Sequence, residues 1–280
     1  MFLSAACIAA CAQPDANRGA EQRRESAVAA DSASVSGEWP ADLGGALVVP
    51  SDTENLALVL YPVTAGAQGA AGASLTLVSS SGDTVRRQVG LEAQDSLHCG
   101  DATIARLARA TPLSWSVGIQ SAAATPLRTD SMDALRAADS VFYSAEMARL
   151  ASAVSAEQAS RFTGLPFTLA TLRRFRIDGR EVVVSQVVRR VNQEADPLEE
   201  RTMIVAERSA AAAEFTAVHS GRSDGNEDNT DHFDLLAALR TARGTILVLA
   251  REKPTGTIFD ILERDADGVW RVKWSRSIAC

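Results

Sequence analysis

The residues best suited to acid–base chemistry gather in one segment of the last quarter of the chain. The sequence holds only three histidines, His98, His219 and His232. His219 precedes a stretch rich in acidic and amide side chains, and Asp231 stands next to His232 near its end. If the fold brings these side chains together, they supply an acid–base pair or part of a metal cluster. One hypothesis is therefore a hydrolase that uses the 219–234 region.

The same segment carries oxygen-bearing side chains at alternate positions. Asp224, Asn226 and Asp228 are spaced like the first ligands of an EF-hand calcium loop. The resemblance ends there, because Asn229 stands at the usual glycine position and Leu235 at the position of the closing glutamate. Two interpretations remain: a weak Ca²⁺ site, or a polar surface loop whose residues favour turns. No other cofactor is indicated.

Several sequence motifs for common chemistries are missing from the chain. It has no Walker A loop, and no HExxH, CxxC or SxxK motif. The formal net charge is -7. Because phosphate backbones are bound by basic surfaces, we do not expect nucleic acid as a partner. An enzyme is less favoured than a protein that binds something without reacting.

Two further groups of residues have a structural interpretation that is stronger than a functional one. An acidic cluster lies between two predicted strands, so we expect a solvated connection and not a pair of catalytic carboxylates; it comprises Glu194, Asp196, Glu199 and Glu200. Three tryptophans alternate with polar residues or stand in predicted strands, so we expect core positions and not a ligand groove; they are Trp115, Trp270 and Trp274.

The first residues predict where in the cell the protein is located. Phe2–Ala10 is a run of small and apolar residues, and the sequence Ile8-Ala9-Ala10-Cys11 resembles the lipobox of bacterial lipoproteins. The resemblance implies that residues 1–10 are a signal peptide and that Cys11 carries a lipid. The expected location is then the bacterial cell envelope, outside the cytoplasm, with the membrane as a partner.

Two features of this start depart from the lipoprotein pattern. The apolar run is short, and no lysine or arginine precedes Cys11. Both would be explained if the true start lies upstream of Met1. The alternative is an alanine-rich N-terminus with two incidental thiols, in a cytosolic protein.

Composition divides the remaining chain. Residues 12–42 are poor in large apolar side chains, so residues 11–45 are predicted to be a disordered tether behind the lipid. We expect an N-terminal β unit with helices over 46–160 and a C-terminal antiparallel sheet over 161–280.

The last two cysteines suggest a covalent link between these parts. In an exported chain, Cys99 and Cys280 predict one disulfide. It would close a loop of 280 − 99 = 181 residues and, in the chain-entropy model, stabilise the fold by about 5 kcal/mol. The alternative is a pair of buried free thiols. His98 beside Cys99 does not favour a catalytic pair, because adjacent side chains rarely face each other.

Hydrophobic patterning predicts an α+β protein that is rich in antiparallel strands. Short strands are expected between residues 47 and 119, with a helix over 101–110. Asp130 is predicted to cap a helix that runs to about Ala153 and buries Leu135, Ala138, Phe142 and Ala145. A capping box at 155–158 predicts a second, short helix.

The C-terminal part predicts a meander of strands joined by hairpins. The expected strands are 169–177, 181–191, 202–208, 214–219, 245–251, 257–264 and a last strand through Trp270 and Trp274, with 235–239 ambiguous. One face of this sheet is expected to pack on the helical pair and the other to face water. The leading hypothesis is a non-enzymatic envelope lipoprotein with a binding or structural role; the alternatives are an extracytoplasmic hydrolase or a calcium-binding protein that uses the 219–234 region.

Overall fold

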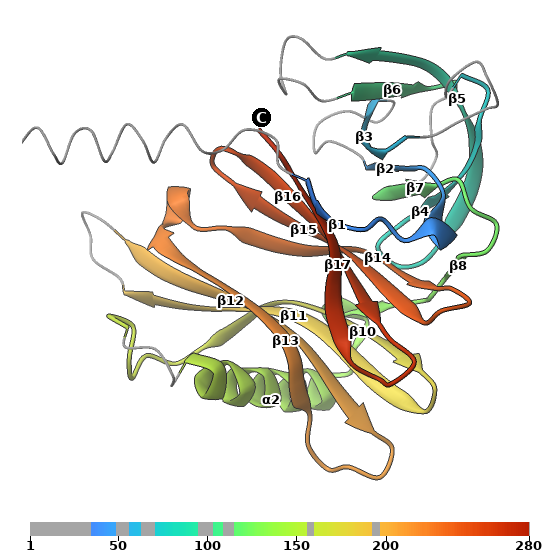
Figure 1. Cartoon of the computed structure of the whole chain (residues 1–280). Coiled ribbons are helices and arrows are strands. Elements are labelled where there is room, and N and C mark those ends of the chain that lie inside the picture. Colours follow the sequence, from blue (N-terminus) through green and yellow to red (C-terminus); the bar gives the residue numbers. More distant parts are fainter. Residues whose placement is uncertain are drawn as a thin grey trace, which may run out of the picture. The chain divides into compact units, whose positions relative to one another are not determined.

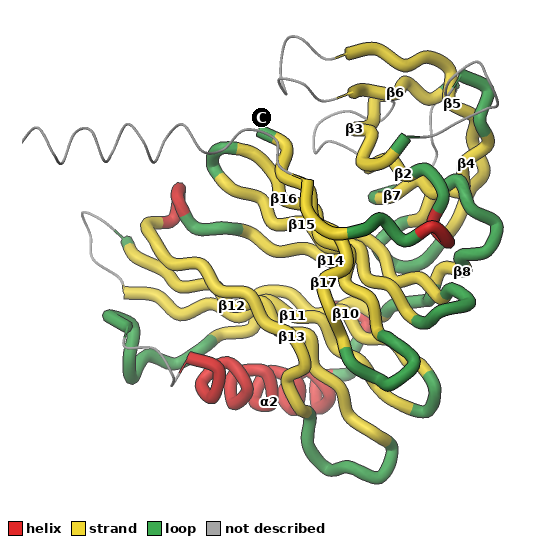
Figure 2. Tube along the Cα trace, in the orientation of Figure 1, coloured by secondary structure: helices red, strands yellow, loops and turns green. Residues whose placement is uncertain are grey.

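The described part of the chain consists mostly of antiparallel β-strands (Figures 1 and 2). The structure is a computed structural model, and it describes residues 35–48, 56–62, 71–94, 103–108, 115–155, 160–191 and 197–279. All of these residues belong to one unit, Ala33–Cys280. Their strands form a six-stranded sheet, a five-stranded sheet and a small closed barrel.

The six-stranded sheet is mainly a C-terminal meander. Its central strands are nearly continuous apolar runs, and both of its faces are buried. Across the sheet the order is β1 (Val35–Gly37), β17 (Trp270–Ile278), β16 (Gly256–Arg264), β15 (Thr245–Lys253), β14 (His232–Arg240) and β8 (Thr125–Pro126).

The five-stranded sheet comes from the middle of the chain. Its order is β13 (Thr216–Asn226), β12 (Leu198–Ser209), β11 (Arg180–Val191), β10 (Thr168–Ile177) and β9 (Asp130–Ser131). Asp178 and Gly179 join β10 to β11 with φ values of 48° and 71°. Two positive φ values in a two-residue hairpin match the twist of the flanking strands, so the predicted Asp-Gly turn is confirmed.

The barrel is built from short strands of the N-terminal part. Its order is β2 (Ala46–Val48), β3 (Leu56–Tyr61), β6 (Thr103–Leu107), β5 (Thr84–Gln94), β4 (Ser74–Val78) and β7 (Val117–Ile119). Small and branched side chains fill its interior together with Trp115. Gly118 lies close to this packing, because a Cβ atom there would be 2.9 Å from Leu77 Cδ2, and that side chain would have to shift. The barrel is therefore a packed core and not a pore.

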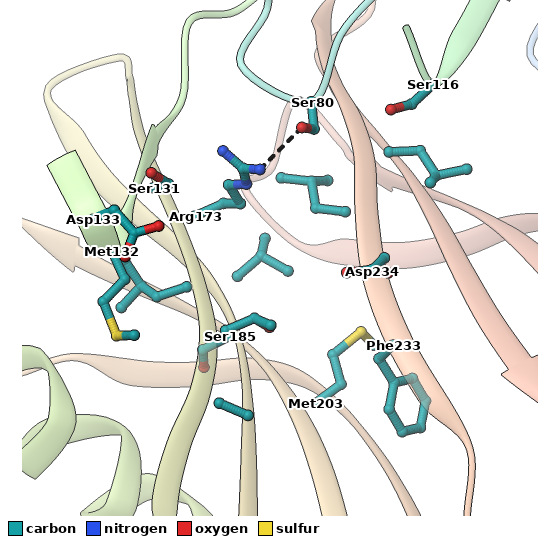
Figure 3. Close-up of a pocket in the computed structure, with 16 residues that line it drawn as sticks. Ser80, Ser116, Ser131, Met132, Asp133, Arg173, Ser185, Met203, Phe233 and Asp234 are labelled. Atoms are coloured by element: carbon teal, nitrogen blue, oxygen red, sulfur yellow. Dashed lines mark hydrogen bonds between the residues drawn. The ribbon is translucent and has the colours of Figure 1, made fainter. Parts of the chain in front are cut away.

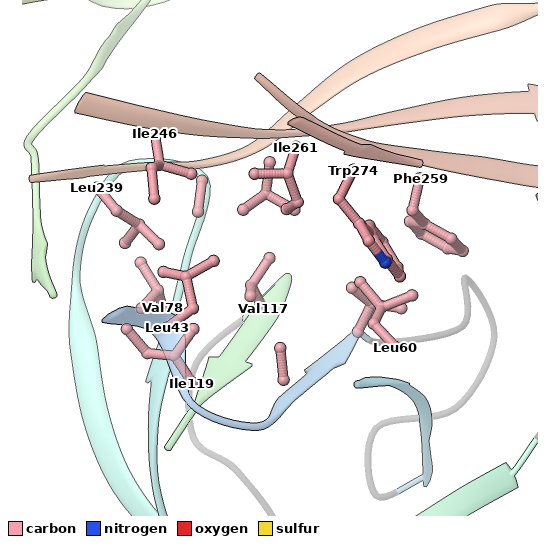
Figure 4. Close-up of a cluster of buried hydrophobic side chains, with 14 of the residues drawn as sticks. Leu43, Leu60, Val78, Val117, Ile119, Leu239, Ile246, Phe259, Ile261 and Trp274 are labelled. Atoms are coloured by element: carbon pink, nitrogen blue, oxygen red, sulfur yellow. The ribbon is translucent and has the colours of Figure 1, made fainter. Parts of the chain in front are cut away.

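Three apolar interfaces connect the elements. The two sheets bury a common core that includes Phe175, Phe233 and Leu262. The other face of the six-stranded sheet packs on the barrel, with Leu239 and Ile119 in that contact (Figure 4). Helix α2 (Ala137–Ser155) covers the other face of the five-stranded sheet. The order of packing is thus helix, five-stranded sheet, six-stranded sheet and barrel.

The predicted α+β class, with a C-terminal meander sheet packed on a central helical pair, is wrong. The protein is mostly β-sheet, and the described residues contain one α-helix, α2. Ser155, expected to open a second helix, is the last residue of α2. Neither face of the meander β14–β17 is exposed to water as predicted: the five-stranded sheet covers one face, and the barrel covers the other. The apolar runs of these strands required two partners, and the sequence did not reveal the second.

Helix α2 begins later than predicted and buries another face. Asp130 belongs to β9, and a 3₁₀ turn, η3 (Met132–Ala134), precedes the helix. The buried side chains include Tyr143 and Met147, whereas Phe142 stays partly exposed. The Tyr143 hydroxyl donates a hydrogen bond to Glu181 on β11, which explains why the tyrosine and not the phenylalanine faces the sheet.

Three other expectations have clear outcomes. The segment expected to be a helix at 101–110 contains β6, whose β-branched and apolar residues pair with β3 and β5. Glu199 and Glu200 lie buried in β12 and not in a solvated loop, because arginines neutralise them. Trp115, Trp270 and Trp274 are buried, as predicted.

The N-terminal assignments meet the structure only in part. Within the segment expected to be a tether, Val35–Gly37 pair with β17, and Trp39 and Leu43 are buried. Two short 3₁₀ turns, η1 (Ala41–Leu43) and η4 (Glu227–Asn229), complete the described helical elements. All four cysteines, Cys11, Cys99 and Cys280 included, lie outside the described residues. No helix among the residues that the structure describes is long and apolar enough to cross a membrane.

Candidate functional site

A cavity of about 410 Å³ lies where the barrel and the two sheets meet (Figure 3). We call it the edge cavity, because the edges of β10 and β14 line it. Its volume falls in the range of about 300–1,000 Å³ that is typical of small-molecule sites. The lining residues are Ser80, Ser116, Ser131–Asp133, Ala170–Arg173, Val184, Ser185, Met203 and Phe233–Leu236.

A short crossing segment pairs with only a few residues at the outer edges of β10 and β14, so most of each edge is left without a described strand partner. Residues 125–131 cross from one sheet to the other: β8 pairs with Leu239 and Arg240 of β14, and β9 pairs with Arg173 and Arg174 of β10. Beyond these few pairs, no described strand covers the outer edge of β10 from Thr168 to Leu172. The sandwich is therefore open on this side, and the edge cavity lies at the opening.

Both strands carry a β-bulge at the cavity. The register of β10 shifts between Leu169 and Thr171, and that of β14 shifts between Leu235 and Ala237. The extra residues are Ala170 and Leu236, and both line the cavity. Bulges bend a strand and redirect its side chains, and they are frequent beside functional sites. Two bulges on facing edges keep the sheets from closing over the cavity.

The barrel contributes a rigid turn to the wall. The turn between β4 and β5 is joined to the crossing segment by Thr129, whose N–H donates to Ser81 O (3.1 Å) and whose hydroxyl donates to Ser80 O (2.6 Å). Gly82 has φ 88°, and a Cβ atom there would lie 2.2 Å from Leu127 O. This close approach fixes Ser80 at the cavity.

Arg173 is the cation of the edge cavity. Its Nη2 donates a hydrogen bond to Ser80 Oγ (3.0 Å), as Figure 3 shows. Among the described residues, no carboxylate lies within ion-pair distance of Arg173, whereas the next residue, Arg174, pairs with Asp130 at 3.0 Å. An arginine offers five N–H donors, so most of those of Arg173 remain available to a ligand.

Two carboxylates stand near the cavity opening. Asp133 on η3 and Asp234 on β14 both line it, and neither has a hydrogen bond or an ion pair within the described residues. Asp234 keeps contact with solvent, but the protein around it restricts hydration and raises the pKa of its carboxyl group. The charges of His232 and Arg173 oppose that rise only in part.

The remaining wall is largely apolar. Leu172, Val184 and Leu235 contribute aliphatic surface, and Met132 and Met203 add flexible thioether side chains that adapt to different shapes. Ser185 lies in this wall with 2% of its surface exposed, and its Oγ has no hydrogen-bond partner in the described part of the chain. Its strand partners Leu172 and Ile204 both pack against α2, so the Ser185 hydroxyl lies on the helix side of the five-stranded sheet.

A second polar cluster lies at the other end of β11 and β12, and it is internally matched. Glu200 is fully buried and accepts hydrogen bonds from Arg189 and Arg222. Burial would raise the pKa of Glu199, but hydrogen bonds from Arg190 and Arg201 outweigh it and lower that pKa. Each carboxylate is thus held by two arginines, and every arginine of the cluster contacts a carboxylate, so these groups are engaged with one another although the positive charges outnumber the negative ones.

The histidines proposed from the sequence do not meet in this structure. His232 contacts Arg201, and Asp231 forms an ion pair with Arg251 at 3.7 Å. His219 lies on β13, where burial lowers the pKa of its imidazole, and Asp260 opposes that effect only in part. None of the three lines the edge cavity. Of the residues in segment 219–234, only Phe233 and Asp234 line the edge cavity.

The proposed calcium ligands have other contacts. Asp224 pairs with Arg161 at 3.5 Å, and Asn226 Oδ1 accepts a hydrogen bond from Asn229. Asp228 lies in η4, after the end of β13. In the part of the chain that the structure describes, no three histidine, cysteine, aspartate or glutamate side chains form a group that could hold a metal ion.

Comparison of the chain with models of known families, with curated proteins and with solved structures finds no match. The geometry of the edge cavity therefore carries the functional argument alone. Sequence reasoning missed Arg173, Ser80 and Ser185. They come from three separate elements, and no motif joins them; the one available signal was that Arg173 and Arg174 stand side by side in a strand that is expected to be half-buried.

Proposed function

We propose that this protein is a non-enzymatic binding protein of the bacterial cell envelope, held at the membrane by a lipid on Cys11, and that the edge cavity is its ligand site. One observation carries the proposal. The cavity of about 410 Å³ opens between two bulged strand edges and is lined by Arg173, a cation without an ion-pair partner among the described residues. Polar groups of this kind beside an apolar wall are typical of binding sites.

The lining residues favour binding over catalysis. They include four serines but no histidine, cysteine or lysine. A serine nucleophile needs a neighbouring base that takes its proton. The described partner of the Ser80 hydroxyl is the guanidinium of Arg173, which holds its own protons throughout the accessible pH range. The hydrolase alternative, built on His219, His232 and Asp231, lacks a common pocket for these side chains.

Ligand binding can be tested with small probes on the full chain. We would label the protein with ¹⁵N and titrate it with hexanol, hexanoate, hexylamine and L-leucyl-L-leucine, each at up to millimolar concentration. At least one probe is expected to shift the amide signals of Ala170 and Leu236. The variant Ala170→Trp, which places a large ring at the opening, is expected to abolish those shifts.

Two results would contradict the binding site. Either no probe shifts the signals of the lining residues, or the shifts persist in Ala170→Trp while its spectrum shows a folded protein. Mass analysis of L-leucyl-L-leucine after incubation tests the enzymatic alternative, because release of leucine would require a hydrolytic site.

The membrane anchor requires a separate experiment. Mass spectrometry of the mature N-terminus, after expression in a bacterial host, is expected to find a lipid-modified Cys11, and Cys11→Ala is expected to release the protein from the membrane. An unmodified Met1 on a cytosolic protein would contradict the anchor without affecting the cavity.

A further inference from the structure

The charges around the edge cavity are unmatched, in contrast to those elsewhere. Among the residues that the structure describes, neither Arg173 nor Asp133 nor Asp234 forms an ion pair, although Arg173 acts on Asp234 electrostatically at longer range. Nearby charges of the same two sheets are paired, for example Arg174 with Asp130 and Arg251 with Asp231. One positive and two negative groups thus face the same space with hydrogen-bonding capacity unused.

The positions of these groups match a ligand with separated charges. Arg173 comes from β10 and Asp234 from β14, so the cation and one anion stand on facing walls (Figure 3). The apolar side chains Val184 and Met203, which face the space between the two sheets, also line the cavity. The opposite charges sit near each other without closing into an ion pair, and a ligand between them would satisfy both.

We infer that the edge cavity binds a short zwitterionic peptide with apolar side chains, whose carboxylate pairs with Arg173 and whose ammonium group lies against Asp234. This inference rests on the proposed function and specifies its ligand. The aliphatic side chains of the peptide contact the apolar wall, and its backbone can hydrogen-bond to the open edge of β10.

Other ligand classes match the charges less well. A phosphate ester would bring two negative charges to a site with one cation and two carboxylates, so repulsion opposes it. A fatty acid would satisfy Arg173 but leave both carboxylates unpaired. A simple amine would leave the arginine unpaired. The peptide is the class that pairs both signs and also fills the apolar wall.

Isothermal titration calorimetry of the full chain tests the inference with three matched probes. L-leucyl-L-leucine keeps both charges, its N-acetyl form lacks the ammonium, and its C-terminal amide lacks the carboxylate. We expect the unmodified dipeptide to bind at least tenfold more tightly than either derivative. Arg173→Gln is expected to remove the advantage over the amide, and Asp234→Asn the advantage over the N-acetyl form.

Two control variants remove charges that lie away from the cavity. Arg176→Gln changes an exposed arginine on the same strand as Arg173, and Asp178→Asn changes an exposed aspartate in the hairpin turn. Both are expected to bind the dipeptide as the unaltered protein does. Circular dichroism melting of each variant verifies that it is folded before its affinity is interpreted.

The outcomes separate this inference from the proposed function. If all three probes bind with equal affinity, or if only the N-acetyl form binds, the zwitterionic ligand is refuted while a binding cavity remains. The same conclusion follows if none of them binds but hexanol or hexanoate still shifts Ala170 and Leu236. If no probe of either set binds, both proposals fail.

Discussion

Glu200 is the residue whose replacement most sharply tests how the five-stranded sheet is stabilised. Its carboxylate is fully buried, and Arg189, which is 6% exposed, donates to it through Nε (3.1 Å) and Nη2 (3.0 Å). Arg222 donates at 2.7 Å, and the hydroxyls of Ser155 and Ser160 donate at 3.3 and 3.1 Å. The carboxylate thus connects strands β11, β12 and β13 with the end of α2.

Glu200→Gln keeps the shape of the side chain and removes its charge. The guanidinium of Arg189 then stays buried without a counter-ion, and the new amide group presents N–H donors to other donors. Removing one partner of a buried ion pair costs about 3–5 kcal/mol. We expect the free energy of unfolding, measured by urea denaturation at pH 7, to fall by that amount.

The control is Asp178→Asn, which removes one partner of an exposed ion pair with Arg240. Exposed pairs contribute about 0–1 kcal/mol, so this variant should unfold almost as the unaltered protein does. The double variant Arg189→Met/Glu200→Leu replaces the pair by apolar side chains and should recover part of the loss. If Glu200→Gln is no less stable than Asp178→Asn, the buried cluster does not stabilise the sheet as argued.

Three further changes test other parts of the structure. Gly82→Ala should lower the free energy of unfolding by more than about 1 kcal/mol, because φ is positive there and the new Cβ atom would meet Leu127 O; an unchanged urea midpoint would show that this turn is not held as described. Arg276→Met removes a donor that hydrogen-bonds to the carbonyls of Val59 and Leu60, both at 2.9 Å. We expect the free energy of unfolding to fall by about 1–3 kcal/mol in the same assay. A rise in that free energy would contradict the role of Arg276 in joining β17 to the barrel. The lowered pKa of His219 means that the folded protein takes up its proton less readily than the unfolded chain does, so this residue's contribution is full above pH 6.5 and is lost as the pH falls below it. His219→Gln should therefore reduce the dependence of stability on pH between 7 and 5, and an unaltered dependence would refute the assignment.

Local signals in the sequence predicted the hairpins well. The Asp178-Gly179 turn, the strands on either side of Pro254–Gly256 and the alternating strand from Trp270 all form where their turn residues and period indicate. These features depend on backbone preferences of a few adjacent residues, and such preferences are legible in one sequence.

Contacts between residues far apart in the chain could not be predicted from the sequence. Glu199 and Glu200 looked like part of a solvated loop because the arginines that neutralise them come partly from other strands. The face of α2 was misassigned because Phe142 and Tyr143 differ little in hydrophobicity, and the choice between them depends on Glu181 across the sheet. In each case a distant partner decides the burial of a residue.

The edge cavity could not have been predicted for the same reason. Its two bulges depend on the register between strands, and a shifted register leaves no composition signal at Ala170 or Leu236. The sequence did draw attention to the segment that ends in Asp234. The sequence did not indicate which residue faces Asp234 across the cavity, because Arg173 lies about sixty positions earlier in the chain.

A crystal structure of the full chain with L-leucyl-L-leucine would test the central claim most directly. The account predicts density for the dipeptide in the edge cavity, with its carboxylate at Arg173 and its leucine side chains against Val184 and Met203. An empty cavity at a dipeptide concentration that saturates the calorimetric signal, or a dipeptide bound elsewhere on the protein, would contradict it.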